Sequence, residues 1–165
     1  MKTTELSPTL ARLFTELVNG APEGGDAFML NSGDLGLLRS LERLSAADAS
    51  QSANGGATIA AHARHVQYGL SLMNRWAQEG GNPFADARWD EAWKTSHVDE
   101  EEWRSIREGL EQECSRWRQV LGSSREVSAV ELAGLIGSIA HLAYHLGAIR
   151  QIARAARGPK DGTFT

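Results

Sequence analysis

Two histidines, His141 and His145, stand four residues apart in the largely apolar stretch 138–150. On an α-helix, positions i and i+4 lie on one face and about 6 Å apart. Both imidazole rings can therefore reach one metal ion, at about 2.1 Å per bond. Burying two imidazoles costs free energy unless both find partners. The spacing therefore indicates a metal site, with a third ligand to be found elsewhere in the chain.

A second helical stretch carries His62 and His65 toward its inner side and can supply that third ligand. From the spacing alone, either of the two could do so. The fifth histidine, His97, lies in a connecting segment. A single histidine on an apolar helix face is more often a hydrogen-bonded core residue than a ligand. A plain helical interaction protein with histidines in its core therefore stays open as an alternative.

Several known motifs are absent from the sequence. The pair reads His-Leu-Ala-Tyr-His and lacks the glutamate base of zinc metalloproteases. Ferritin-like di-iron sites need Glu-x-x-His motifs, and neither Glu79 nor Glu131 stands three residues before a histidine. No nucleophile-elbow motif is present for a serine triad. The single cysteine, Cys114, shares an apolar stripe with Leu110 and Trp117, which favours an inert core thiol.

Length and composition fit one globular domain. The chain has 165 residues, of which 41% are hydrophobic and 23% charged, values typical of a soluble protein with a full core. The net charge of -4 argues against a nucleic-acid or anionic membrane surface. We find no uninterrupted apolar run of about 18 residues and no signal peptide, so no membrane segment is expected. The single cysteine favours a reducing, cytoplasmic location.

The elements that must position the histidines are helices, since almost every apolar repeat has helical spacing and no strand pattern stands out. Residues 20–33 and 45–57 are expected to be surface loops. The connection 80–98 is longer than the usual loop of about 2–8 residues between packed helices. We expect it to cross from one end of the domain to the other, with room for a short helix. The expected helices cover residues 8–19, 35–44, 59–79, 100–121 and 129–157.

Capping residues support these boundaries. Thr58 precedes the helix with His62 and His65, and Asp99 with Glu102 forms a capping-box pattern before the next helix. Ser128 with Glu131 forms another before the helix of the histidine pair, which Gly158-Pro159 should end. Four main helices and one long crossover predict an all-α four-helix bundle, in which metal sites lie on side chains of facing helices.

Two segments resemble the DinB/YfiT-like metalloenzyme superfamily. Residues 58–66 (TIAAHARHV) are similar to its first histidine segment, and residues 140–149 (AHLAYHLGAI) to its H-x-x-x-H-x-G-x-I segment. Residues 37–45 (LLRSLERLS) look like the end of the family's first helix. The resemblance covers 33–157 and implies a DinB-like bundle in up-down-down-up order. Residues 1–32 would then be a short helical extension and 158–165 a tail.

The resemblance also implies a function. It carries over one divalent metal ion, Zn2+ or Ni2+ before Fe2+, held by His65, His141 and His145, with His62 as the competing candidate. Relatives include thiol S-transferases that use bacillithiol, mycothiol or glutathione, and a maleylpyruvate isomerase. A metal-dependent transferase, hydrolase or isomerase acting on a small molecule, with a low-molecular-weight thiol as a further cofactor, is therefore expected. A homodimer is compatible with this. The alternative is a non-catalytic metal-binding module of stress response or interaction.

Overall fold

The computed structural model describes residues 2–159, and every regular element in that range is a helix. Isolated bridges join short stretches of backbone, but residues 2–159 contain no strand. The all-α class predicted from the sequence is confirmed. In chain order the elements are α1 (Ser7–Asn19), α2 (Gly36–Glu42), α3 (Ala46–Ala49), α4 (Ile59–Glu79), α5 (Trp89–Ala92), α6 (Glu100–Gly122), α7 (Ala129–Ile152) and the 3-10 turn η1 (Arg154–Ala156).

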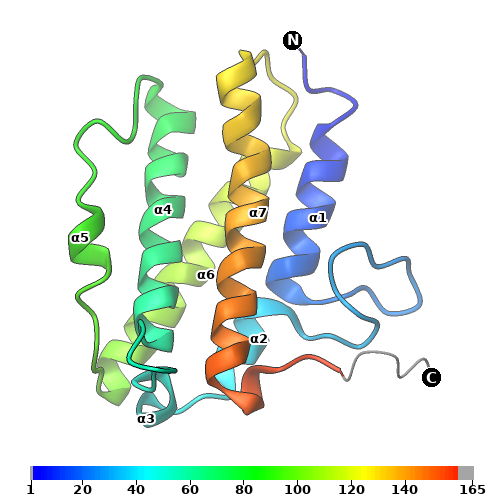
Figure 1. Ribbon diagram of the computed structural model, residues 1–165. Helices are drawn as coiled ribbons and strands as arrows, with labels where there is room; N and C mark the ends of the chain where they lie inside the picture. The colour runs from blue at the N-terminus through cyan, green and yellow to red at the C-terminus, as the bar shows by residue number, and fades with distance from the viewer. Residues whose placement is uncertain (1, 160–165) are drawn as a thin grey trace.

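Four long helices, α1, α4, α6 and α7, lie side by side along the molecule (Figure 1). Helices α1 and α4 each pack against both α6 and α7, so they occupy opposite corners. Helices α4 and α6 begin at the same end, where the Thr58 hydroxyl donates to the Thr95 carbonyl at 3.1 Å. Helices α1 and α7 run in the opposite direction (Figure 1). Because α4 and α6 are parallel, the chain between them must run back along the whole bundle.

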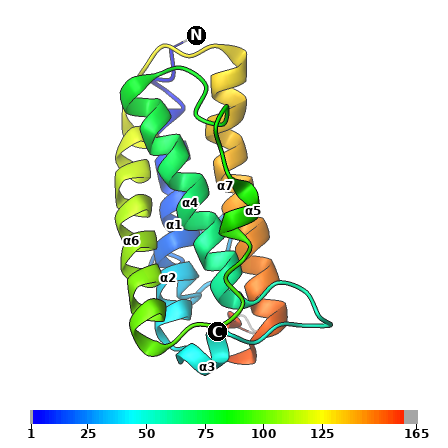
Figure 2. The same ribbon diagram turned by 90° about the vertical axis from the view of Figure 1, so that its left-hand side faces the viewer.

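That crossover passes over the outside of the bundle and carries the short helix α5. Figure 2 shows it lying over the seam between α4 and α7. Tyr68 on α4 accepts a hydrogen bond from the backbone N–H of Arg88 at 2.9 Å, which ties the crossover to the bundle. The expected crossing from one end to the other is therefore confirmed.

Helix α1 is one of the four long helices of the bundle and packs against both α6 and α7. Its side chains Phe14 and Leu17 belong to the main core cluster. The loop 21–35 is closed at its base, where the N–H of Ala21 donates to the carbonyl of Asp34 at 3.0 Å. Both ends of this loop carry glycines with positive φ, Gly20 (101°) and Gly36 (70°), in close backbone contact. Helix α2 thus begins where α1 ends, so residues before 33 share one core with the rest.

Both predicted capping boxes are present, before α6 and before α7. Two other boundaries were wrong. Helix α7 ends at Ile152 instead of 157, because Ala153 is extended and the side chain of Arg150 binds the carbonyl of Ala156 at 3.1 Å. The expected loop 45–57 contains α3, which has its own capping box. The expected tail lies outside the described residues, apart from Gly158 and Pro159.

Helix α7 is apolar on nearly all sides. Its inner face contributes Leu135, Ile139, Leu142 and Leu146 to the core. Within residues 2–159 it is the one helix that is long and apolar enough to cross a membrane, with a mean hydropathy of 1.5. Ser138, His141 and His145 interrupt the apolar residues of this helix, so the sequence shows no unbroken apolar run there. Length and hydropathy alone are weak evidence for a membrane span, because the core helix of a soluble protein can meet the same criterion.

Candidate metal centre

Helices α4 and α7 bring four of the five histidines together. His62 and His65 project from the first two turns of α4, and His141 and His145 from the second half of α7. Ligand atoms of His65, His141 and His145 all lie within 4.8 Å of one another. His65 and His145 are buried, whereas His141 is exposed, so the cluster is open on one side. His97 is exposed and does not belong to this group.

The nitrogen atoms of these three rings face one another. His141 Nε2 lies 2.9 Å from His145 Nε2 and 3.2 Å from His65 Nε2. Two nitrogen ligands of one ion, each bonded at about 2.0–2.1 Å, lie about 2.9–3.4 Å apart when the angle between them is about 90–110°. Both separations fall in that range. The three residues therefore fit a divalent ion that prefers imidazole ligands.

His62 takes a different position. Its Nδ1 lies 2.9 Å from Nδ1 of His145, on the ring edge that faces away from the other two histidines. If Nε2 of His145 binds a metal, its Nδ1 carries the proton and donates to His62. Such hydrogen bonds fix the tautomer and the ring orientation of a metal-binding histidine. The geometry thus gives His62 a supporting contact.

The environment keeps all four imidazoles neutral. Burial lowers the pKa of His62 and of His141. It lowers the pKa of His65 to about 4 and that of His145 to about 3, and repulsion from the neighbouring histidines adds to both shifts. A metal ion needs the unprotonated form of each ligand. At neutral pH each ring therefore has a free lone pair on one of its two nitrogen atoms.

Two tryptophans of the crossover cover the cluster. The ring of Trp93 stacks on His65, with centroids 4.2 Å apart and planes inclined by 24°. Trp89 lies 5.3 Å from the same ring. The sequence predicts the crossover that carries both residues but does not assign them to the site. Their position depends on where the crossover meets α4, and the sequence carries no local signal for this.

One buried nitrogen of the cluster has no partner. Nδ1 of His65 makes no hydrogen bond within the described part of the chain.

Cys114, by contrast, lies in the core away from the histidines, and burial raises the pKa of its thiol to about 12. The expectation of an inert core thiol is confirmed. Of these two candidate groups, the histidines rather than the thiol are therefore available to bind a ligand.

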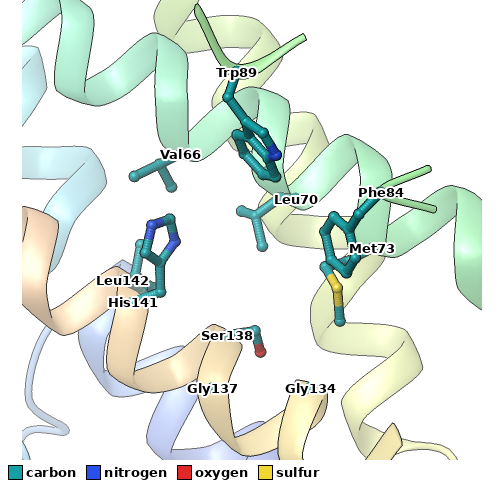
Figure 3. Close-up of a pocket in the computed structure, with 11 residues that line it drawn as sticks. Val66, Leu70, Met73, Phe84, Trp89, Gly134, Gly137, Ser138, His141 and Leu142 are labelled. Carbon is teal, nitrogen blue, oxygen red and sulfur yellow. The ribbon is translucent and has the colours of Figure 1, made fainter. Parts of the chain in front are cut away.

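A hollow of about 280 Å³ opens beside His141, between α4 and α7 (Figure 3). Phe84 and Trp89 from the crossover form one side of it, and Gly134 and Gly137 of α7 form another. A ligand that reaches the histidines from this side would lie in the hollow.

Comparisons of the chain with protein-family models, curated proteins and solved structures found no match in any of the three. The resemblance to the DinB/YfiT-like superfamily therefore rests on the sequence segments 37–45, 58–66 and 140–149 alone.

Proposed function

We propose that this chain is a DinB-like protein that binds one divalent metal ion through His65, His141 and His145. The observation that carries the proposal is the set of Nε2 separations, 2.9 Å and 3.2 Å, among three neutral rings from two helices. The ring nitrogens of one ion's ligands have this spacing. Zn2+ and Ni2+ suit such a set best, and Fe2+ also binds imidazole.

The order of the helices supports the same family. Parallel α4 and α6, joined by a long crossover, agree with the up-down-down-up bundle that the resemblance implies. The first helix of that bundle would consist of α1 and α2 together, with the loop 21–35 inserted between them. This arrangement explains why residues 37–45 look like the end of a first helix.

We further propose a metal-dependent enzyme of the transferase, hydrolase or isomerase type. Three neutral ligands leave the full charge of the ion and open coordination positions, so a bound ion would polarise a carbonyl or lower the pKa of a water or thiol. The residues of this chain would hold the ion, orient His145 through His62, and exclude water with Trp89 and Trp93.

The second candidate is a non-catalytic metal-binding module. It is favoured by Trp93, which lies on His65 and contacts the rings of His62 and His145, closing one side of the cluster. Binding of acetohydroxamate, a small metal chelator, to the zinc-loaded protein separates the two. The enzyme requires an accessible ion and hence measurable binding by calorimetry. A closed module shows none.

Elemental analysis of the purified protein tests the metal site. We expect about one divalent ion per chain, and loss of most of it in His65→Ala, His141→Ala and His145→Ala. His97→Ala is the matched control, because His97 is exposed and lies outside the cluster. Equal metal content in the parent protein and in His141→Ala and His145→Ala would contradict the proposal.

A further inference from the structure

We infer that the hollow between α4 and α7 binds the neutral, apolar body of a small ligand whose polar head reaches the histidines. The inference rests on the proposed metal site and adds the class of ligand. It follows from the chemistry of the hollow's walls, from their shape and from the absence of charge.

The walls are apolar, and one end is polar. Val66, Leu70 and Met73 of α4 line the hollow together with Phe84 and Trp89 of the crossover (Figure 3). Among the described residues that line it, the polar groups are the hydroxyl of Ser138, the imidazole of His141 and the indole N–H of Trp89.

Ser138 has its hydrogen bonds already. Its hydroxyl donates to the carbonyl of Leu135 at 2.7 Å and accepts from Nε1 of Trp117 at 2.9 Å. The imidazole of His141 and the indole N–H of Trp89 therefore remain as the groups that would interact with a polar head. A ligand in this hollow would be polar at one end and apolar along the rest.

Glycines on the α7 side of the hollow keep it open. A Cβ atom at Gly137 would meet nothing within 4 Å, and one at Gly134 would meet only the end of Met73. Glycine inside a helix is less stable than alanine by about 0.5–1 kcal/mol. The helix itself gains nothing from these two glycines, whereas the hollow gains room for a ligand.

The volume suits a ring or a short chain. A cavity of about 150 Å³ can bind benzene, and this hollow holds about 280 Å³. A second hollow of about 360 Å³ shares Met73, Phe84 and Gly134 with it and continues toward the start of α7. A longer apolar chain could extend into this second space.

The charged side chains around the two hollows argue against a ligand whose apolar part is replaced by an anionic group. No lysine or arginine of the described residues lines either hollow, and the one charged side chain there is Glu131, in the second. The carboxylates of a charged thiol such as glutathione would find no cationic side chain among the described residues that line these two hollows. Arg64 and Arg88 line a separate hollow beside α5. The groove thus selects a neutral, apolar group.

Alkyl hydroxamates of increasing length test the inference with zinc-loaded protein. Calorimetry should show binding that tightens by up to about fourfold for each methylene added between acetohydroxamate and octanohydroxamate, since each buried methylene contributes about 0.8 kcal/mol. A probe of equal length that ends in a carboxylate should bind at least about tenfold more weakly than octanohydroxamate.

Two matched glycine variants locate the effect. Gly137→Leu fills the hollow, and it should abolish the dependence on chain length while the metal content stays normal. Gly147→Leu is the control, because Gly147 lies on the same helix, has equally open space at its Cβ position and lines neither hollow. Both substitutions replace a helical glycine, so their effects on folding should be alike.

The outcomes distinguish a failure of the ligand-binding hollow from a failure of the proposed metal site. Equal affinities of all chain lengths, with normal zinc content and binding of acetohydroxamate, would overturn the groove and leave the metal site intact. Absence of bound zinc would overturn the proposed function instead. The groove is then tested with the n-alcohols from butanol to octanol. Their affinities must rise with length in the parent protein and in Gly147→Leu but not in Gly137→Leu, and a flat series would overturn the inference.

Discussion

The base of the loop 21–35 and the histidine cluster both bury polar side chains, but they complete their hydrogen bonding in different ways. At the loop, the carboxylate of Glu16 accepts backbone N–H bonds from Phe28, Met29 and Leu30, the shortest two at 2.7 Å. Asp34 accepts from the N–H of Gly36 at 2.8 Å and from Arg150 at 2.6 Å. Each buried acid thus has its donors within the chain.

The histidine cluster lacks such complementary groups. Its hydrogen bonds join one imidazole to another, and Nδ1 of His65 has no partner among the described residues. A neutral imidazole carries one donor and one acceptor. Nε2 of His141 faces Nε2 of both His65 and His145, and because it carries either one proton or one lone pair it can form a full hydrogen bond with only one of them.

A structural polar site thus differs from a ligand site in whether the chain itself supplies the partner of each buried polar group. The chain supplies both charges at the loop, where Arg150 neutralises Asp34. At the histidines it supplies acceptors without a cation. A divalent ion would satisfy the Nε2 atoms of His65, His141 and His145 as Arg150 satisfies Asp34. The two regions should therefore respond differently to removal of Arg150, to substitution of His62 and to pH.

Removal of Arg150 should produce the largest effect on stability. The substitution Arg150→Met leaves Asp34 buried and unpaired, with 3% of its side chain exposed. Breaking a buried pair in this way costs about 3–5 kcal/mol, which lowers Tm by about 10 °C in a domain of this size. Thermal unfolding followed by circular dichroism measures the change. Metal content should stay normal.

Arg154→Met is the control for this substitution, because Arg154 is exposed and lies one turn further along the chain. The double variant Asp34→Asn/Arg150→Met should regain part of the loss, since the unpaired charge is gone. If Arg150→Met instead removed the metal while leaving Tm unchanged, the division between the two regions would be wrong.

Local signals in the sequence explain what could be predicted. The capping boxes at Ser128 and Asp99 lie within four residues of their partners, and both are present in the structure. The i, i+4 spacing of His141 and His145 likewise needs only a helix. The spacing on α4 left both His62 and His65 open as a further member, the resemblance favoured His65, and the structure brings His65 into the cluster.

Contacts between distant segments explain what could not be predicted. The ion pair between Asp34 and Arg150 joins residues 116 positions apart, and the bonds of Arg150 accompany the early end of α7. The corner position of α1 depends on the closed base of the loop 21–35. Trp93 reaches His65 only because the crossover passes over that seam. None of these contacts leaves a periodic pattern in the sequence.

Substitution of His62 should have an intermediate effect, now on the metal. His62→Ala removes the contact to Nδ1 of His145, which lies at 2.9 Å. Loss of such a supporting hydrogen bond typically weakens metal affinity by about 10–100-fold. Competition with a chromophoric chelator measures this affinity. His62→Gln retains an acceptor and should recover part of it.

A ligand and a supporting residue give different results in this experiment. If His62 were itself a ligand, His62→Ala would lose as much affinity as His141→Ala, and glutamine would not restore it. An affinity equal to that of the parent protein would show that the contact between His62 and His145 does not orient the site.

Lower pH should have a graded effect on the stability of the metal-free protein. Folding holds the pKa of His65 at about 4 and that of His145 at about 3, against about 6.5 in the unfolded chain. The folded state therefore binds fewer protons below about pH 6.5. Above about pH 6.5 the lowered pKa values do not reduce the free energy of unfolding. Below it, the free energy of unfolding decreases as pH falls, by at most about 1.4 kcal/mol per pH unit for each ring.

Urea unfolding at about pH 7, 6 and 5, with a chelator present, separates the histidines from the acids. Unfolded aspartate and glutamate stay largely ionised above about pH 5, so the loop should contribute little to the slope in this range. His145→Gln should flatten the dependence, whereas His97→Gln, at an exposed position, should leave it unchanged. If His145→Gln kept the slope of the parent protein, His145 would not be held neutral by burial. The contrast between a complete acidic region and an incomplete histidine region would then need another basis.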